Sequence, residues 1–262
     1  MNLRRLALAA CALVFMLGRP PPAAVAAEIP VIAAAADLQF ALTELAEGFG
    51  KQTGKSVKLV FGSSGGFFRQ IKEGAPFELF LSADESYALD LARDGLTRDQ
   101  GVLYAVGRIA LMVPAGSALK ADGSLKDLAA ALDAGRVKKF AIANPDHAPY
   151  GRAAREALKT AGLWDKIQDK LVLGENVSQA AHYATTGAAA GGIIASSLAL
   201  SPKVAALGQS ALIPEDWHAP LHQRMVLTTK AGEAATAFYG YIQSPAARAV
   251  FKAYGFILPE ER

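Results

Sequence analysis

The sequence predicts an α/β protein of two lobes, each built on a mostly parallel sheet with helices on its faces. Three observations support this prediction. Short apolar runs alternate with helical patterns along most of the chain, which is the order expected of βαβ units. The 262 residues are enough for two lobes of ordinary size, and 52% of them are hydrophobic, which permits sizeable cores. The number of βα units suits two sheets of similar size better than one sheet.

The first 27 residues have the pattern of a secretory signal peptide. "MNLRR" is basic, "LALAACALVFML" is apolar, and "AAVAA" offers small residues for cleavage near Ala26 or Ala27. The apolar run is too short to span a bilayer, so we expect an exported protein. Cys11 in "LAAC" superficially matches a lipoprotein site, but it comes early in an apolar run that continues after it, and we expect no lipidation.

Removal of residues 1–27 would take three arginines and no acidic residue from the chain. It would leave 24 of the 27 basic residues against 24 acidic ones. A balanced surface argues against a nucleic-acid partner, because phosphate binding needs a clustered basic face. The mature chain would also contain no cysteine, which excludes disulfides and thiolate chemistry.

In the first part of the mature chain, apolar periodicity and glycine stops predict the elements. Strands are expected in "IPVIAAAA", "SVKLVF" and "FELFLS". Asp37 is expected to cap a helix that stops near Gly54, and two more helices are expected over "FFRQIKEG" and from about Asp84 to Gly95. "RIALMVPAG" predicts the next strand, and we expect the chain to cross into the second lobe there.

The second part of the chain continues the alternation. Strands are expected in "FAIANP", "KLVLG", "GGIIAS" and "HQRMVLTT", and helices over "YGRAAREALKTAGLW", "NVSQAAHYATTGAA", "AGEAATAFYGYIQ" and "SPAARAVFKAYGF". We expect the chain to return to the first lobe near "HQRMVLTTK". The predicted boundaries are therefore 1–27 for the signal peptide, 28–108 and 228–262 for the first lobe, and 109–227 for the second.

The stretch "GSSGG", residues 62–66, satisfies G-x-S-x-G, the turn that presents a nucleophilic serine between a strand and a helix. A serine hydrolase that uses Ser64 is therefore one alternative. A triad would also need a histidine held by a carboxylate. The available histidines stand in no distinctive local motif: His147, His182, His218 and His222.

A cation site has little support in the sequence. His218 and His222 are four residues apart, but Pro220 between them argues against one helical face, so we expect no direct cation ligands.

Four predicted strand-to-helix junctions share small or hydroxyl residues. They are "AADLQ" at 35–39, "GSSGG" at 62–66, "APYG" at 148–151 and "ENVSQ" at 175–179. Helix N-termini offer unpaired N–H groups and the positive end of the helix dipole, so several around one cleft could hold an oxyanion without a basic residue. In α/β sheets, ligands usually sit beyond the carboxyl ends of the strands.

At these segments the sequence resembles the periplasmic molybdate-binding proteins of ABC importers. The resemblance runs over nearly the whole mature chain, and its most specific parts are "GAP-x-x-x-F-x-SAD" and "NP-x-x-AP-x-G". It implies a type II-like periplasmic binding protein, a monomer whose lobes close over molybdate or tungstate in the cleft between them. It also implies delivery of the ion to a membrane permease, with no catalysis and no cofactor.

The resemblance further implies which positions bind the oxyanion. Ser64 would donate its hydroxyl, Val177 its backbone N–H, and Tyr150 the phenol that some members carry at the position of Ala195. The full set of implied positions is Ala36, Asp37, Ser63, Ser64, Tyr150, Val177 and Ala195.

Asp37 departs from the family pattern, which has Ser, Thr or Asn at this position. An ionised carboxylate accepts hydrogen bonds but cannot donate one to a dianion. Three accounts stay open: Asp37 caps its helix with the side chain turned away, it is protonated in the complex and donates, or the ligand carries the proton. The third account would favour hydrogenphosphate or hydrogenarsenate over molybdate.

Overall fold

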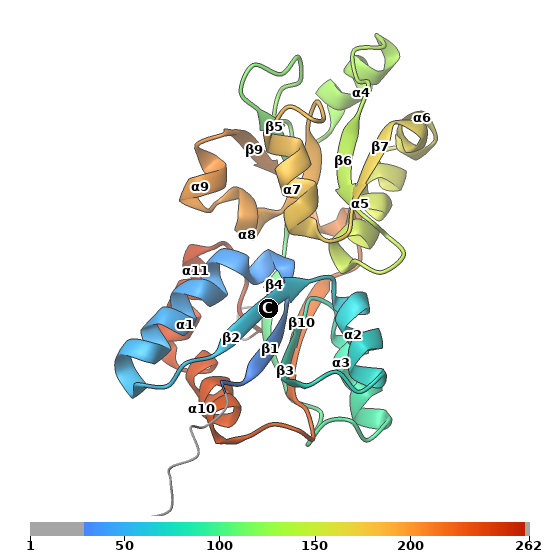
Figure 1. The fold of residues 1–262 in the computed structure, drawn as a ribbon. Coiled ribbons are helices and arrows are strands. Elements are labelled where there is room, and N and C mark those ends of the chain that lie inside the picture. Colours follow the sequence, from blue (N-terminus) through green and yellow to red (C-terminus); the bar gives the residue numbers. More distant parts are fainter. Residues whose placement is uncertain (1–28, 260–262) are drawn as a thin grey trace, which may run out of the picture.

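The computed structural model describes residues 29–259, which form two lobes around two five-stranded sheets (Figure 1). The predicted signal peptide, its cleavage site and Cys11 lie outside the described residues. None of the helices between residues 29 and 259 combines the length and the apolar composition that crossing a bilayer requires.

The sheet of the first lobe has the strand order β2-β1-β3-β10-β4. Only β10 runs antiparallel to its neighbours, so four of the five strands point the same way. The carboxyl ends of these four strands therefore lie at one edge of the sheet. The strands are β1 (Val31–Ala35), β2 (Lys58–Gly62), β3 (Phe77–Ser82), β4 (Val102–Gly107) and β10 (Leu221–Leu227).

Helices cover both faces of this sheet, with α1, α10 and α11 on one face and α2 and α3 on the other (Figure 1). The helix α1 buries Ala41, Leu42, Leu45 and Phe49 at helical spacing, and it ends at Gly54, whose positive φ suits a residue without a side chain. The bounds are η1 (Ala36–Leu38), α1 (Gln39–Thr53), α2 (Ser64–Lys72), α3 (Glu85–Arg93), α10 (Glu233–Ile242) and α11 (Pro245–Ala253).

The second lobe repeats the arrangement with the strand order β7-β6-β8-β5-β9, in which only β5 is antiparallel to its neighbours. The strands are β5 (Ile109–Pro114), β6 (Phe140–Ala143), β7 (Leu171–Gly174), β8 (Gly192–Ala195) and β9 (Gly208–Leu212). The helices are α4 (Lys126–Asp133), α5 (Pro149–Thr160), α6 (Trp164–Ile167), η2 (Gln168–Lys170), α7 (Val177–Thr185), α8 (Ser196–Ala199), α9 (Pro202–Ala205) and η3 (Glu215–Trp217). The predicted α/β class with two mostly parallel sheets is confirmed.

The chain crosses between the lobes twice within residues 29–259. The first crossing is abrupt, because β4 ends in the first sheet at Gly107 and β5 begins in the second at Ile109. The second crossing lies between β9 and β10. The return was expected near "HQRMVLTTK", but the lobe boundary at residue 228 is wrong, because residues 221–227 form β10, which pairs with β3 and β4 of the first sheet.

The core of the first lobe generates a stability prediction. The Phe49 ring lies 5.1 Å from that of Phe238 and 5.5 Å from that of Tyr241, and its side chain is buried. Phe49→Ala should therefore lower the free energy of unfolding by about 3–5 kcal/mol and the melting temperature by about 10 °C. Calorimetry measures both. Leu212→Ala, at a side chain that is 55% exposed, is the control; an equal loss there would contradict this account.

Candidate functional site

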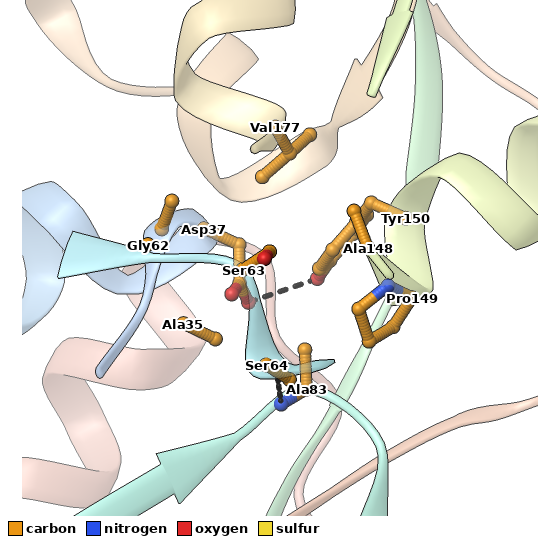
Figure 2. Close-up of a pocket in the computed structure, with 11 residues that line it drawn as sticks. Ala35, Asp37, Gly62, Ser63, Ser64, Ala83, Ala148, Pro149, Tyr150 and Val177 are labelled. Carbon is orange, nitrogen blue, oxygen red and sulfur yellow. Dashed lines mark hydrogen bonds between the residues drawn. The ribbon is translucent and has the colours of Figure 1, made fainter. Parts of the chain in front are cut away.

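A small cavity lies where the two lobes meet, with a space of about 180 Å³ between the residues that line it (Figure 2). Its enclosed volume, about 10 Å³, is far smaller than the pockets of about 300–1,000 Å³ that hold drug-sized ligands. No lysine, arginine or histidine lines it among the described residues. The lining residues are Ala35, Ala36, Asp37, Gly62, Ser63, Ser64 and Ala83 from the first lobe, and Ala148, Pro149, Tyr150 and Val177 from the second.

Ser63 and Ser64 reach the cavity from the start of α2. Ser63 is the N-cap of this helix, and its hydroxyl accepts a hydrogen bond from the N–H of Gly66 at 3.2 Å. The Ser64 hydroxyl is fully buried and accepts the N–H of Ala83 at 2.9 Å. Because this bond uses an acceptor position of the Ser64 oxygen, the hydroxyl proton is free to be donated into the cavity.

The second lobe contributes the first turns of two helices. Tyr150 lies in the first turn of α5, after Pro149 at the first helical position, and Val177 opens α7 behind the N-cap Asn176. The Asn176 side chain accepts the N–H groups of Ser178 and Gln179. The first N–H groups of an α-helix have no partner within the helix, so α2, α5 and α7 turn three positive helix ends toward one small space.

Asp37 lines the same cavity but does not cap a helix. It lies within η1, and neither η1 nor α1 has a side-chain cap. One carboxylate oxygen, Oδ2, accepts hydrogen bonds from the Tyr150 hydroxyl at 3.0 Å and from Nε2 of Gln223 at 2.7 Å. The other, Oδ1, is buried without a hydrogen-bond partner. The predicted capping role, with the side chain turned away from the site, is therefore wrong.

Burial has the largest effect on the ionisation of Asp37. It raises the pKa of Asp37 from 3.8 to about 6, although the bonds from Gln223 and Tyr150 act in the opposite direction. Burial, and then the charge of Asp37, raise the pKa of Tyr150 well above its usual value. The same two causes act on Tyr104, whose hydroxyl bonds to Gln223. Both phenols therefore stay protonated and can donate hydrogen bonds.

The lobes touch around the cavity through direct bonds. The N–H of Gly65 in α2 donates to the carbonyl of His147 in the second lobe at 3.0 Å. The Ser178 hydroxyl donates to the carbonyl of Ala36 at 2.8 Å. At the rim, Arg152 of α5 forms an ion pair with Asp84. These contacts hold the lobes closed over the cavity.

The family model described as bacterial extracellular solute-binding protein matches residues 30–257. The chain belongs to this family.

Among its relatives, the molybdate-binding protein ModA of Azotobacter vinelandii is 37% identical over 237 residues, which cover 89% of this chain and 91% of that protein. ModA of Rhodobacter capsulatus is 35% identical over 95% of each chain. The solved structure of the Azotobacter vinelandii periplasmic molybdate-binding protein superposes with a TM-score of 0.80 at 33% identity, covering 88% of this chain and 99% of that one. The resemblance seen in the sequence is thus confirmed.

The structure brings six of the seven predicted site residues together. Ala195 is the exception, because it ends β8 opposite Ile109, is fully buried in the core of the second lobe, and does not line the cavity. Ser64 also lacks the partner that a nucleophile needs. The nearby histidine ring, that of His147, bonds through Nδ1 to the Ser63 hydroxyl at 2.9 Å instead.

Two residues at the site were missed by the sequence analysis. Gln223 of β10 is fully buried and bonds to both Asp37 and Tyr150. Ser197 of α8 donates to the carbonyl of Asp37 at 2.8 Å. The available signal was strand alternation, which puts Gln223 on the same buried face as Leu221 and Met225, where an amide must find partners.

The raised pKa of Asp37 predicts how stability depends on pH. The native protein binds the Asp37 proton more tightly than the unfolded chain does. The stability that this proton contributes to the folded state is therefore fully present below pH 3.8 and is lost as pH rises through about 6. The loss is on the order of 3 kcal/mol, at about 1.4 kcal/mol for each pKa unit. Denaturant unfolding of the wild type and of Asp37→Asn, across this range, measures it. A difference between the two proteins that does not change with pH would contradict the prediction.

Proposed function

We propose that this chain is the exported binding component of an ABC importer and that it captures molybdate or tungstate. The observation that carries the proposal is the composition of the interlobe cavity. It is small, it is lined by hydroxyls and helix N-termini, and it has no cationic side chain among the described residues. Its relatives named above are molybdate-binding proteins, and they match nearly the whole chain.

A cavity of neutral donors suits a small oxyanion. Each helix N-terminus carries the equivalent of about half a positive charge, so the ends of α2, α5 and α7 offset much of a dianion. Hydrogen bonds to charged groups are stronger than neutral ones. The hydroxyls of Ser63 and Ser64 would donate to the ligand, and the backbone N–H groups of Ala36 and Val177 would complete its shell. Tyr150 would keep its one hydroxyl proton on Asp37 and border the ligand from the second lobe.

Capture of the ion would need no covalent step. Ligand held by both lobes favours the closed arrangement, because only that arrangement satisfies donors from both sides. Release to a membrane permease would follow when the lobes separate. This mechanism uses Ser64 as a donor, in keeping with its bond to Ala83 and with the absence of a histidine on its hydroxyl among the described contacts.

The first test is ligand-dependent melting of the purified protein. At about a thousand times its dissociation constant a ligand adds roughly 4 kcal/mol of stability, which should raise the melting temperature by about 10 °C. Molybdate and tungstate should give this shift, and sulfate and phosphate a much smaller one. If none of the four ions changes the melting temperature, or if phosphate alone does, the proposed ligand is wrong.

A second test removes one donor. A hydrogen bond to a charged group contributes about 1.5–3 kcal/mol, so Ser64→Ala should weaken molybdate binding about ten- to a hundredfold. Titration calorimetry measures the dissociation constant. Ser82→Ala is the matched control, since Ser82 is equally buried at the end of β3 but bonds to Asp84 and does not line the cavity. Equal weakening in both variants would remove Ser64 from the site.

A third test acts on closure alone. A Cβ on Gly65 would lie 2.6 Å from the carbonyl oxygen of His147 and 2.8 Å from the Tyr87 hydroxyl, so Gly65→Ala should hold the lobes apart. We expect molybdate binding to weaken at least about tenfold while the radius of gyration in small-angle scattering increases. Gly240→Ala, whose Cβ would meet nothing within 4 Å, is the control. Wild-type affinity in Gly65→Ala would show that closure is not required.

A further inference from the structure

Asp37 is a buried acid whose two oxygens have different surroundings. Its side chain is 1% exposed. The oxygen Oδ2 accepts from Tyr150 and Gln223, whereas Oδ1 has no partner and no contact with solvent. Figure 2 shows the carboxyl group directed into the cavity, toward the space beside Ser63. A buried polar atom without a partner is rare in folded proteins and calls for an explanation.

The groups that face Asp37 from the surrounding elements supply no positive charge. They are the hydroxyls of Tyr150 from α5 and Tyr104 from β4, the Gln223 amide from β10 and, at the backbone carbonyl of Asp37, the Ser197 hydroxyl from α8. Only the two tyrosines can titrate, and both stay protonated. Near the cavity, the His147 ring bonds through Nδ1 to the Ser63 hydroxyl and lies, through Nε2, 3.5 Å from Glu175, and among the described contacts no bond links it to Asp37.

An ionised Asp37 and an oxyanion dianion would therefore meet in one small cavity without a cation between them. Two negative groups that share a site repel each other strongly enough to make one take a proton. Molybdate stays a dianion at neutral pH. The group that must change is then the carboxylate.

We propose that Asp37 binds the oxyanion as a neutral carboxylic acid, with the proton on Oδ1 donated to the ligand, so that capture of each dianion takes up one proton from solvent. Oδ2 keeps its bonds from Tyr150 and Gln223, and Oδ1 gains the partner that it lacks. The proton goes from water to Oδ1, and no covalent bond changes. This inference rests on the proposed oxyanion function and specifies how that site is regulated.

The proton linkage has a definite sign. Burial raises the pKa of Asp37 to about 6 before any ligand binds, so most molecules are ionised at neutral pH. A bound dianion raises that pKa further. Above about pH 6.5 the dissociation constant for molybdate should therefore rise about tenfold for each pH unit, and below that it should level off.

The experiment is titration calorimetry of the purified full chain with sodium molybdate, from about pH 6 to about pH 8.5. Each pH is measured in two buffers of different ionisation enthalpy, because the difference in heat counts the protons taken up. We expect close to one proton per molybdate at the alkaline end, together with the tenfold slope. A merely structural role of Asp37 would not produce proton uptake.

Asp37→Asn is the neutral analogue of the proposed state. Its amide oxygen can accept from Tyr150 and Gln223 while its amide N–H donates to the ligand. We expect no proton uptake, a flat pH profile, and an affinity at about pH 8 that is at least tenfold tighter than that of the wild type. Asp84→Asn is the control, because asparagine keeps the N-cap of α3 but loses the ion pair with Arg152. It should shift the affinity at every pH and keep the slope.

Three results would overturn the inference while leaving molybdate binding intact. The first is tight binding by the wild type without proton uptake, which decides the question even if Asp37→Asn does not fold. The second is an unchanged slope in Asp37→Asn, which would assign the uptake to another group such as His147. The third is a loss of binding in Asp37→Asn. By contrast, no heat with molybdate at any pH, in wild type and variants alike, would mean that the proposed function itself is wrong.

Discussion

A buried hydrogen-bond cluster of Asp37, Tyr150 and Gln223 joins the two lobes at the centre of the molecule. Tyr150 comes from the second lobe, and the other two come from the first. The Tyr104 hydroxyl fixes the orientation of the Gln223 amide, since it donates to the amide oxygen and leaves Nε2 for Asp37. The closed arrangement of the lobes, the raised pKa of Asp37 and the shape of the cavity all depend on this cluster, because each needs these side chains in contact and away from water.

Strand direction explains why the cavity forms at this place. Four strands of each sheet are parallel, and the loops after β1, β2, β6 and β7 lead into η1, α2, α5 and α7, which border the cavity. Parallel strands put their carboxyl ends, and thus the helix starts that follow, at the same edge of the sheet. When two such edges face each other, helix N-termini from both lobes meet. The positive contribution of these helix ends is therefore a property of the backbone and needs no basic side chain.

The sequence predicted those features that are local. The strand-to-helix junctions at Ser64, Tyr150 and Val177 were found from short patterns and from the family resemblance, and all three residues line the cavity. The strand β4 was missed, because the predicted strand began at Arg108, and Arg108 alone separates β4 from β5.

Features that depend on distant pairing could not be predicted in the same way. The strand β10 follows the whole second lobe in the sequence, yet it inserts between β3 and β4, and the predicted lobe boundary at residue 228 therefore fell seven residues late. Gln223 lies on that strand, so its role depends on a pairing that no local pattern encodes. The same holds for Ser197 and for the bond between Tyr150 and Asp37, which joins residues 113 positions apart.

An aspartate at this position has a thermodynamic consequence for a binding protein. Without ligand, the Asp37 carboxylate already accepts from Tyr150 and Gln223, so it occupies donors that an incoming anion could otherwise use. A ligand must compete with the Asp37 carboxylate for these donors or share them with it. The measured affinity then reflects only the difference in free energy between the bonds to the ligand and the bonds to Asp37. The burial that raises the pKa of Asp37 weakens the internal competitor, because a neutral acid is a poorer acceptor than a carboxylate. The same residue thus limits affinity when it is ionised and supports binding when it is protonated, which ties the strength of capture to the acidity of the surroundings.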